Sequence, residues 1–405
     1  MAVNLEEPTA AYPIKGIRLA TASAGIRYLG RDDLVLIEIN KHSKTAAVFT
    51  KNKFCAAPVI LCKKHISETM PRCLIINAGN ANAGTGQLGE NAALASAQYV
   101  SEHMNITSNQ VLPFSTGVIG EVLDANKIKQ QLSSLTSGLS EKNWLQAAKA
   151  IMTTDTVSKA CSEKITIADQ HVYITGISKG SGMIQPNMAT MLAFIATDLD
   201  IDKQTLQNML TSSVEQSFNA ITVDSDTSTN DACVLIATGK SGINFDSISS
   251  ADKNKFNEAL VRLMKQLAQA IVRDGEGATK FVSVNVKSVS SNKLAKEIAY
   301  SVANSPLVKT ALSASDPNWG RIMAAVGKCD EAELDLSKAS LYLNDVEVMR
   351  FGELSPTYNE AAGKQAMSKS EIDIVIDLNR GSYRHAVWTT DLTHEYVSIN
   401  ADYRS

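Results

Sequence analysis

Strand-like and helix-like segments alternate along all 405 residues of this chain, and no linker separates them. Short runs rich in Val, Ile and Leu, such as 33–40 and 72–79, indicate buried strands. Amphipathic or Ala-rich runs without internal Gly or Pro, such as 89–104 and 202–222, indicate helices. Because no stretch rich in Pro, Gly or Ser interrupts this order, we expect an α/β or α+β protein in which helices cover large sheets.

The remaining elements continue the alternation to the end of the chain. Strands are expected at 44–50, 111–121, 191–198, 232–239, 280–289, 370–378 and 382–405, a hairpin at 164–182, and helices near 124–135, 141–151, 252–277, 293–304 and 317–326. Asp202 is the expected N-cap of its helix, and Gly275 is expected to end the long helix before it. Length alone favours two lobes, although one large sandwich is allowed.

The composition is that of an ordinary globular protein and excludes several functions. Apolar residues make up 44% and charged residues 20%, and the net charge is −3. Since no run of Lys or Arg forms a basic patch, a non-specific nucleic-acid or membrane-surface role is not expected. The N-terminus lacks the basic and apolar regions of a targeting signal, and no apolar run approaches the roughly 20 residues of a membrane helix. We therefore expect a cytoplasmic protein.

Cysteine and histidine usage gives no sign of a metal site. The six histidines show no HxxxH or HxH spacing, so a catalytic zinc ion is not expected. No CxxC pair occurs, and most of the cysteines stand in apolar runs, which is typical of buried, reduced thiols. The cysteines are at positions 55, 62, 73, 161, 233 and 329.

Residues 84–89 form a literal GxGxxG between a strand and a helix, which is the dinucleotide-binding fingerprint in form. The expected strand ends near Asn77, several residues before Gly84. In the fingerprint the first glycine lies in the turn directly after the strand. We therefore favour a structural loop, and we keep a nucleotide-dependent oxidoreductase that uses Gly84–Gly89 as an alternative function.

The segment KGSGMIQPNMATM, residues 179–191, joins a glycine-rich turn to a buried strand. Lys179 precedes its glycines, which reverses the Walker order, so a phosphate loop is not expected. Ala189 and Thr190 stand where the loop meets the strand. As a new chain N-terminus, Thr190 would own both an attacking hydroxyl and a base, its α-amine with a pKa of about 7.7–8.0. On these residues alone, an ordinary threonine at a strand start is the simpler interpretation.

Acyl chemistry at Thr190 would need donors for an oxyanion and groups that hold the substrate. Thr116 and Gly117 supply a hydroxyl and an unshielded N–H in an expected turn after a strand, although a plain β-turn explains them too. Glu276 lies between two glycines at the end of a long helix. A carboxylate there would suit an ammonium group, and its unfavourable position at a helix C-terminus hints at a purpose. The alternative for Glu276 is a solvated loop.

Taken in order, these segments resemble the ornithine acetyltransferase (bifunctional glutamate N-acetyltransferase) family. The resemblance spans the chain and is most specific around residues 179–198. It rests on NAGNANAGTG, STGVIG, MTTDT, GISKGSGMIQPNMATMLAFIATD, TVDSDTSTND, RDGEGATKF, DPNWGRIMAAVG and YVSINADYRS.

The resemblance implies a layered α/β sandwich that cuts itself between Ala189 and Thr190. The products would be an N-terminal chain, 1–189, and a C-terminal chain, 190–405, which together build one active site and assemble as two copies of each. Thr190 would be the nucleophile, and Thr116 and Gly117 would form the oxyanion hole. The implied substrate-binding residues are Thr153, Lys179, Thr190, Glu276, Asn400 and Ser405.

The activity implied by the resemblance belongs to arginine biosynthesis. The acetyl group of N2-acetylornithine would pass to glutamate by a ping-pong mechanism through acetyl-Thr190. No cofactor is expected, and acetyl-CoA stays open as a second acetyl donor. An aminopeptidase-type hydrolase with an N-terminal nucleophile is the same-fold alternative. Against it, Lys179 and Glu276 together suit free amino acids as substrates.

Overall fold

The computed structural model describes residues 2–185, 191–330 and 334–401. Within them the chain forms two compact units, which we describe separately. The sandwich unit comprises Glu7–Asn219 and Asp226–Ile271, and the single-sheet unit comprises Met1–Glu6, Ala220–Ser225 and Val272–Ser405. Among the described residues no helix has the length and apolar character needed to cross a membrane.

Two sheets form the centre of the sandwich unit, with strand orders β1-β2-β4-β5 and β3-β9-β8-β7-β6. Their strands are β1 Ile17–Ala22, β2 Leu34–Ile39, β3 Lys44–Phe49, β4 Cys73–Asn80, β5 Val111–Val118, β6 Lys159–Ile167, β7 Gln170–Lys179, β8 Leu192–Thr197 and β9 Ala232–Ala237. Neighbouring strands are antiparallel except for β4–β5 and β8–β9.

The inner faces of the two sheets pack against each other and form one apolar core. Phe114 of β5 and Phe194 of β8 meet edge to face there, with ring centroids 5.1 Å apart. The expected alternation of Val, Ile and Leu thus becomes strands whose side chains are buried between sheets.

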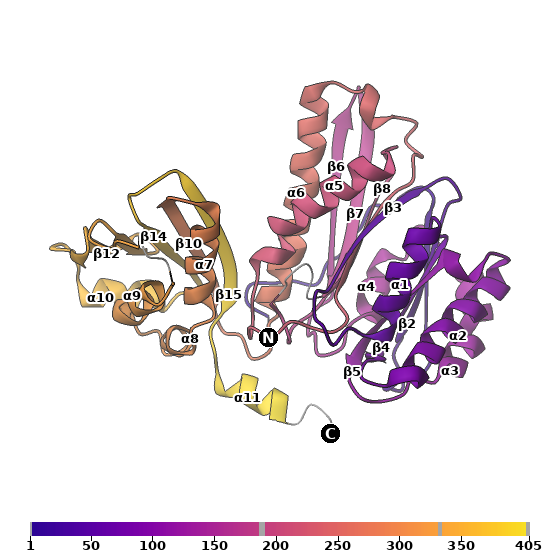
Figure 1. Cartoon of the computed structure of the whole chain (residues 1–405), viewed down its shortest axis with the longest axis horizontal. Helices are drawn as coiled ribbons and strands as arrows, with labels where there is room; N and C mark the ends of the chain where they lie inside the picture. Colours follow the sequence, from indigo (N-terminus) through magenta and orange to yellow (C-terminus); the bar gives the residue numbers. More distant parts are fainter. Residues whose placement is uncertain (1, 186–190, 331–333, 402–405) are drawn as a thin grey trace. The chain divides into compact units, whose positions relative to one another are not determined.

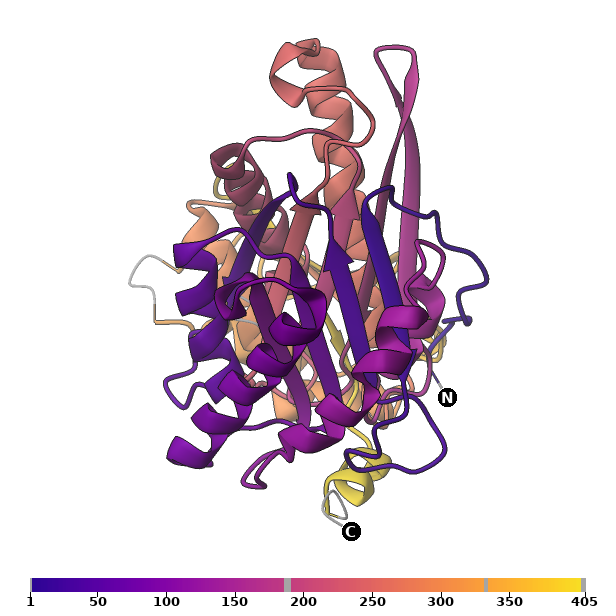
Figure 2. The ribbon, with the colours of Figure 1, turned by 90° about the vertical axis from the view of Figure 1, so that its right-hand side faces the viewer.

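Helices cover the outer faces of both sheets in the sandwich unit (Figures 1 and 2). Helices α2 (Gly86–Met104) and α3 (Ala125–Ser137) pack on the four-stranded sheet, and α5 (Lys203–Glu215) and α6 (Ser250–Arg273) pack on the five-stranded sheet. The shorter helices are α1 (Ala57–Glu68) and α4 (Trp144–Ala150). This helix–sheet–sheet–helix order confirms the predicted layered α/β sandwich.

Helix α5 begins as predicted and ends early. The Asp202 carboxylate accepts hydrogen bonds from the N–H groups of Gln204 and Thr205, as an N-cap does. The helix stops at Glu215 rather than near residue 222, and a 3₁₀ turn, Phe218–Ala220, follows. The chain leaves the helix because the short segment Ala220–Ser225 belongs to the single-sheet unit, where Ile221 forms a bridge with Trp388 of β15.

The single-sheet unit has the strand order β13-β12-β11-β14-β10-β15. Its strands are β10 Phe281–Val289, β11 Ser340–Leu343, β12 Val346–Arg350, β13 Glu353–Leu354, β14 Glu371–Asp377 and β15 Tyr383–Thr390; its helices are α7 Asn292–Ala303, α8 Pro306–Ser313, α9 Trp319–Gly327, α10 Glu360–Met367 and α11 His394–Ala401. Apolar side chains of α7, α8 and α9 form a core with those of β10, β11 and β14.

The prediction of strands throughout 382–405 is wrong for residues 394–401. Strand β15 ends at Thr390, and α11 follows it. The hydroxyl of Thr393 accepts a hydrogen bond from the N–H of Tyr396, three residues on, which is the geometry of a helix N-cap. This local cap starts a helix in a segment whose apolar pattern suggested a strand.

Candidate active site

Thr116 and Gly117 lie inside β5, so the prediction that they form a turn after the strand is wrong. Thr116 pairs with Ala78 and Gly117 with Gly79 of the parallel strand β4, and the register is irregular at the next residue. Gly117 has a φ of +132°, and a Cβ there would lie 2.2 Å from the carbonyl carbon of Gly79. Only glycine fits this close approach of two backbones.

Buried side-chain amides hold the ends of β4 and β5 in this arrangement. The Ser115 hydroxyl donates to Asn77 Oδ1 at 2.6 Å, and Asn77 Nδ2 donates to the carbonyl of Asn80 at 2.8 Å. Asn230 Nδ2 donates to the carbonyls of Ala81 and Ser115 at 2.6 and 2.9 Å. Asn77 of the NAGNANAG segment and Asn230 therefore hold the strand ends beside Thr116 by bonding backbone carbonyls and the Ser115 hydroxyl.

Local packing explains why glycine occupies positions 84 and 89 of the loop. Strand β4 ends at Asn80, four residues before Gly84. A Cβ at Gly84 would meet the ring of Phe54 at 3.0 Å, and one at Gly89 would meet the side chain of Asn82 at 2.8 Å. These contacts support the structural-loop interpretation, and the mostly antiparallel sheet is not the parallel sheet of a dinucleotide-binding fold.

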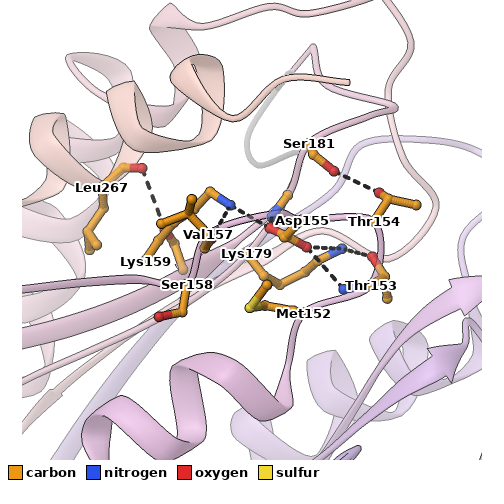
Figure 3. A network of polar contacts seen from close by, with 12 residues as sticks. Met152, Thr153, Thr154, Asp155, Val157, Ser158, Lys159, Lys179, Ser181 and Leu267 are labelled. Atoms are coloured by element: carbon orange, nitrogen blue, oxygen red, sulfur yellow. Dashed lines mark hydrogen bonds and ion pairs between the residues drawn. The ribbon is translucent and has the colours of Figure 1, made fainter. Parts of the chain in front are cut away.

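Lys179, the last residue of β7, brings two of the predicted residues together. Its ammonium donates to Thr153 Oγ1 at 2.8 Å, as Figure 3 shows. It also donates to Thr116 Oγ1 at 3.1 Å. An ammonium has no acceptor, so both hydroxyls accept from it and keep their own hydrogens for another acceptor. Two O–H donors and a cation therefore converge at the end of β7, which suits a carboxylate or a developing oxyanion.

A buried carboxylate, Asp155, stands next to Lys179 in the segment before β6. It forms an ion pair with Lys159 at 2.7 Å and faces Lys179 at 3.9 Å. Burial alone would raise the pKa of the Asp155 carboxyl, but the charges of Lys159 and Lys179 hold that pKa well below its usual range. The carboxylate is therefore ionised at neutral pH.

Thr190 and Ala189 lie outside the described residues, so the structure does not test the nucleophile or the cleavage site. The strand that follows them is described. Leu192 opens β8, opposite Lys179 of β7 on one side and Ala232 of β9 on the other. The predicted buried strand after Thr190 is confirmed, and its first residue belongs to the row of the sheet that contains Lys179.

A second buried carboxyl, Asp231, directly precedes β9. Only 2% of its surface is exposed, and its Oδ2 has no hydrogen-bond partner among the described residues. Burial raises the pKa of Asp231 well above its usual value, although hydrogen bonds and the charge of Lys179 act in the opposite direction. Asp231 therefore favours the neutral form, unlike Asp155.

Glu276 and Asn400 meet in the single-sheet unit. Glu276 follows α6 and is 8% exposed, so it is not a solvated loop residue. Asn400 lies in α11, and its Nδ2 donates to Glu276 Oε2 at 2.9 Å. The structure thus pairs two residues that the resemblance named separately. Ser405 lies outside the described residues.

Sequence reasoning missed Asp155, Lys159, Asp231 and Asn230. Asp155 stands in the quoted segment MTTDT, and Asn230 and Asp231 close the segment TVDSDTSTND. The sequence shows only that each of these polar residues lies next to a strand. Whether such a residue is buried, and therefore a candidate for the site, depends on tertiary packing. No role was assigned to any of them.

Metal and thiol chemistry gain no support from the described residues. Among them no group of three His, Cys, Asp or Glu side chains could hold a metal ion. All six cysteines are free, and Cys62, Cys73 and Cys233 are buried, whereas the other three are half-buried. Burial raises the pKa of Cys73 to about 12 and that of Cys161 to about 11, which disfavours the nucleophilic thiolate.

Comparison with known proteins gives a consistent result over the whole chain. The model described as the ArgJ family matches residues 18–405. The arginine biosynthesis bifunctional protein ArgJ of Psychrobacter arcticus is 51% identical over 403 residues, which cover 99% of each chain. The protein of the same name from Pseudomonas fluorescens is 48% identical over 408 residues, which cover 100% of each. The crystal structure of the bifunctional ArgJ protein of Bacillus halodurans matches 51% of this chain and 97% of its own, at 33% identity and a TM-score of 0.48.

Proposed function

The chain belongs to the ArgJ family, and on this premise we propose that it moves the acetyl group of N2-acetylornithine to glutamate through acetyl-Thr190. As a member of this family it is an N-acetyltransferase of arginine biosynthesis. The products of the proposed transfer are ornithine and N-acetylglutamate. Donor and product are both amides, so the transfer is nearly balanced in free energy and needs no ATP.

One observation supports the proposal most strongly. The Lys179 ammonium contacts the hydroxyls of Thr116 and Thr153, in the row of the sheet where β8 begins two residues after Thr190. A cation and two hydroxyl donors are the groups that an amino-acid carboxylate and a tetrahedral oxyanion require.

The reaction begins with self-cleavage. Thr190 Oγ attacks the carbonyl carbon of Ala189, the C–N bond breaks, and the hydroxyl proton passes to the released amine. Water then hydrolyses the ester and leaves a carboxylate on Ala189. The freed α-amine of Thr190 can now deprotonate its own hydroxyl, because its pKa of about 7.7–8.0 leaves part of it neutral at physiological pH.

The transfer itself has two halves. Thr190 Oγ attacks the acetyl carbon of N2-acetylornithine, and Thr116 and Gly117 stabilise the oxyanion until ornithine leaves. Glutamate then takes the acetyl group from Thr190 in the reverse sense. Lys179 and Thr153 bind the α-carboxylate common to both substrates, and Glu276, Asn400 and Ser405 are assigned to the rest of the substrate.

The proposal extends to assembly and donors. Two copies of each cleaved chain assemble in the cytoplasm, and no cofactor is required. Since the relatives are named bifunctional, acetyl-CoA is the second acetyl donor that we propose. Water must be kept from acetyl-Thr190, because hydrolysis there would turn the transferase into the alternative hydrolase.

Intact mass spectrometry of purified wild type and Thr190→Ala tests the proposal. We expect two masses, for 1–189 and 190–405, from the wild type. A single full-length mass and no acetyl transfer are expected from the variant. After incubation with N2-acetylornithine, the C-terminal chain should gain one acetyl group. A wild-type chain that stays whole and still transfers acetyl groups would disprove the mechanism.

A further inference from the structure

Asp155 binds several parts of the site at once. Its Oδ1 accepts from Lys159 Nζ and from the N–H of Gly180, both at 2.7 Å. Its Oδ2 accepts from the N–H of Thr153 at 3.0 Å and faces Lys179 Nζ at 3.9 Å. Figure 3 shows the carboxylate between the two lysines. One side chain thus connects the loop before β6, strand β6 and the end of β7.

The cost of burying this carboxylate indicates that it has a purpose. Its side chain is fully buried, and an ionised group in the interior destabilises the fold unless it is paired and hydrogen-bonded. Lys159, also fully buried, forms the close ion pair. The pair alone would contribute little stability compared with apolar side chains of the same volume. An apolar replacement of the pair would, however, lose the contacts to Thr153, Gly180 and Lys179, and these contacts are the purpose that we assign to the buried charge.

Lys179 needs a nearby negative charge to remain an ammonium. It is 9% exposed, and burial disfavours the charged form of a lysine. Among the described residues, the carboxyl groups whose charges act on Lys179 are Asp155, next to β6, and Asp231, next to β9. Burial raises the pKa of Asp231 well above its usual value, whereas Asp155 is the carboxylate that stands 3.9 Å from the Lys179 ammonium. Lys159, on the far side of Asp155, adds a second positive charge.

We propose that Asp155 is the positioning residue of this site: it fixes the Lys179 ammonium against Thr116 and Thr153 and keeps it charged. This role rests on the proposed function, in which Lys179 binds the substrate carboxylate. Asp155 itself does not touch the substrate. It acts through Lys179 and, by its bond to the Thr153 N–H, through the loop that carries the Thr153 hydroxyl.

The test is the pH profile of kcat/KM for acetyl transfer in wild type and Asp155→Asn. The amide keeps the shape of the side chain and one acceptor oxygen but removes the charge. Lys179 should then lose its proton at lower pH, so we expect the descending alkaline limb to move down by about 1 pH unit or more. Activity should recover as the pH is lowered. An unmoved limb, or no recovery at any pH in a folded variant, would overturn the proposal.

A matched control separates this role from the loss of any buried carboxylate. Asp198, 4% exposed at the other end of β8, accepts a hydrogen bond from the Tyr173 N–H. Asp198→Asn should leave the alkaline limb in place, and an equal shift there would contradict a role specific to Asp155.

If Asp155→Asn does not fold, the double variant Asp155→Asn with Lys159→Met removes both buried charges together. Its alkaline limb should move in the same direction but by less, because Lys159 no longer repels the Lys179 ammonium. If the wild type itself shows no acetyl transfer, the proposed function fails, whereas a failure of the Asp155 role alone would appear only in the variants.

Discussion

The single hydrogen of the Thr116 hydroxyl cannot point at Lys179, because the lysine ammonium is itself a donor. That hydrogen is directed by the same contact toward whatever acceptor enters the site. Gly117, next in the strand, can exist there only because it lacks a Cβ. Both features are compatible with the oxyanion hole that we propose for Thr116 and Gly117.

Replacing Thr116 by Val keeps the shape of the side chain and removes the donor. We expect kcat for acetyl transfer to fall by about 10²-fold or more, as loss of one oxyanion donor does. Thr45→Val is the matched control, because Thr45 is also buried in the sandwich unit and its hydroxyl has no partner among the described residues. Steady-state kinetics of both variants decide the matter, and an unchanged kcat in Thr116→Val would remove Thr116 from the mechanism.

At the scale of elements, patterns that are long and strongly periodic were predictable. Helices α2 and α6 and strands β2 and β4 fall within four residues of their expected bounds. Their apolar faces are extensive enough to specify burial without knowledge of the partner. The two-residue strand β13 and the eight-residue helices α8 and α10 were not predicted, because their stability comes from tertiary contacts more than from local pattern.

The candidate site was predictable only in part for the same reason. Thr116 and Lys179 were singled out from the residues, and Thr153 only through the resemblance; the structure brings these three together. Asp155 and Asp231 are both buried aspartates, but their pKa values move in opposite directions. The charges of two lysines lower the pKa of Asp155, whereas burial with weaker compensation raises that of Asp231. Nothing in the local sequence distinguishes such environments.

The end of β15 provides a prediction about pH and stability. Lys309 of α8 is buried, and its ammonium donates to the Thr389 hydroxyl and to the carbonyl of Thr390. Burial lowers the pKa of Lys309 to about 8, against the opposing charges of Asp391 and Asp224. The unfolded chain therefore binds this proton more tightly than the folded one. The contribution of Lys309 to stability must rise as the pH increases from about 8 toward 10.5.

Lys309→Met removes this titration. We compare the free energy of unfolding of the wild type with that of the variant. The wild-type value minus the variant value should increase by up to about 3 kcal/mol from pH 7 to pH 10.5, since one pKa unit corresponds to about 1.4 kcal/mol. Urea titrations at several pH values measure the difference. Lys287→Met is the control, because the Lys287 ion pair with Asp377 is partly exposed and should give no such trend. A difference independent of pH would show that Lys309 is not charged differently in the two states.

At the scale of the whole molecule, the proposed cleavage would not separate one compact unit from the other. It would leave the strands of one sheet on two different chains. In the five-stranded sheet, β3, β6 and β7 precede residue 190, whereas β8 and β9 follow it. The strand order β3-β9-β8-β7-β6 therefore places β8 and β9 between strands of the other chain. Two interchain ladders, β3–β9 and β7–β8, would hold the products together.

Cleaved wild-type protein should consequently behave as one particle until it unfolds. We expect both chains to elute together in gel filtration, and to separate in urea only where the far-ultraviolet circular dichroism is lost. Because unfolding then releases two chains instead of one, mass action should make the urea midpoint of the wild type rise with protein concentration more steeply than that of uncleaved Thr190→Ala. Chains that part while the circular dichroism signal remains intact would mean that they do not share a hydrogen-bonded sheet. Equal concentration dependence in the two proteins would mean that the wild-type backbone is never cut, since a cut at Ala189–Thr190 removes the covalent connection between β7 and β8 and leaves their hydrogen-bonded ladder.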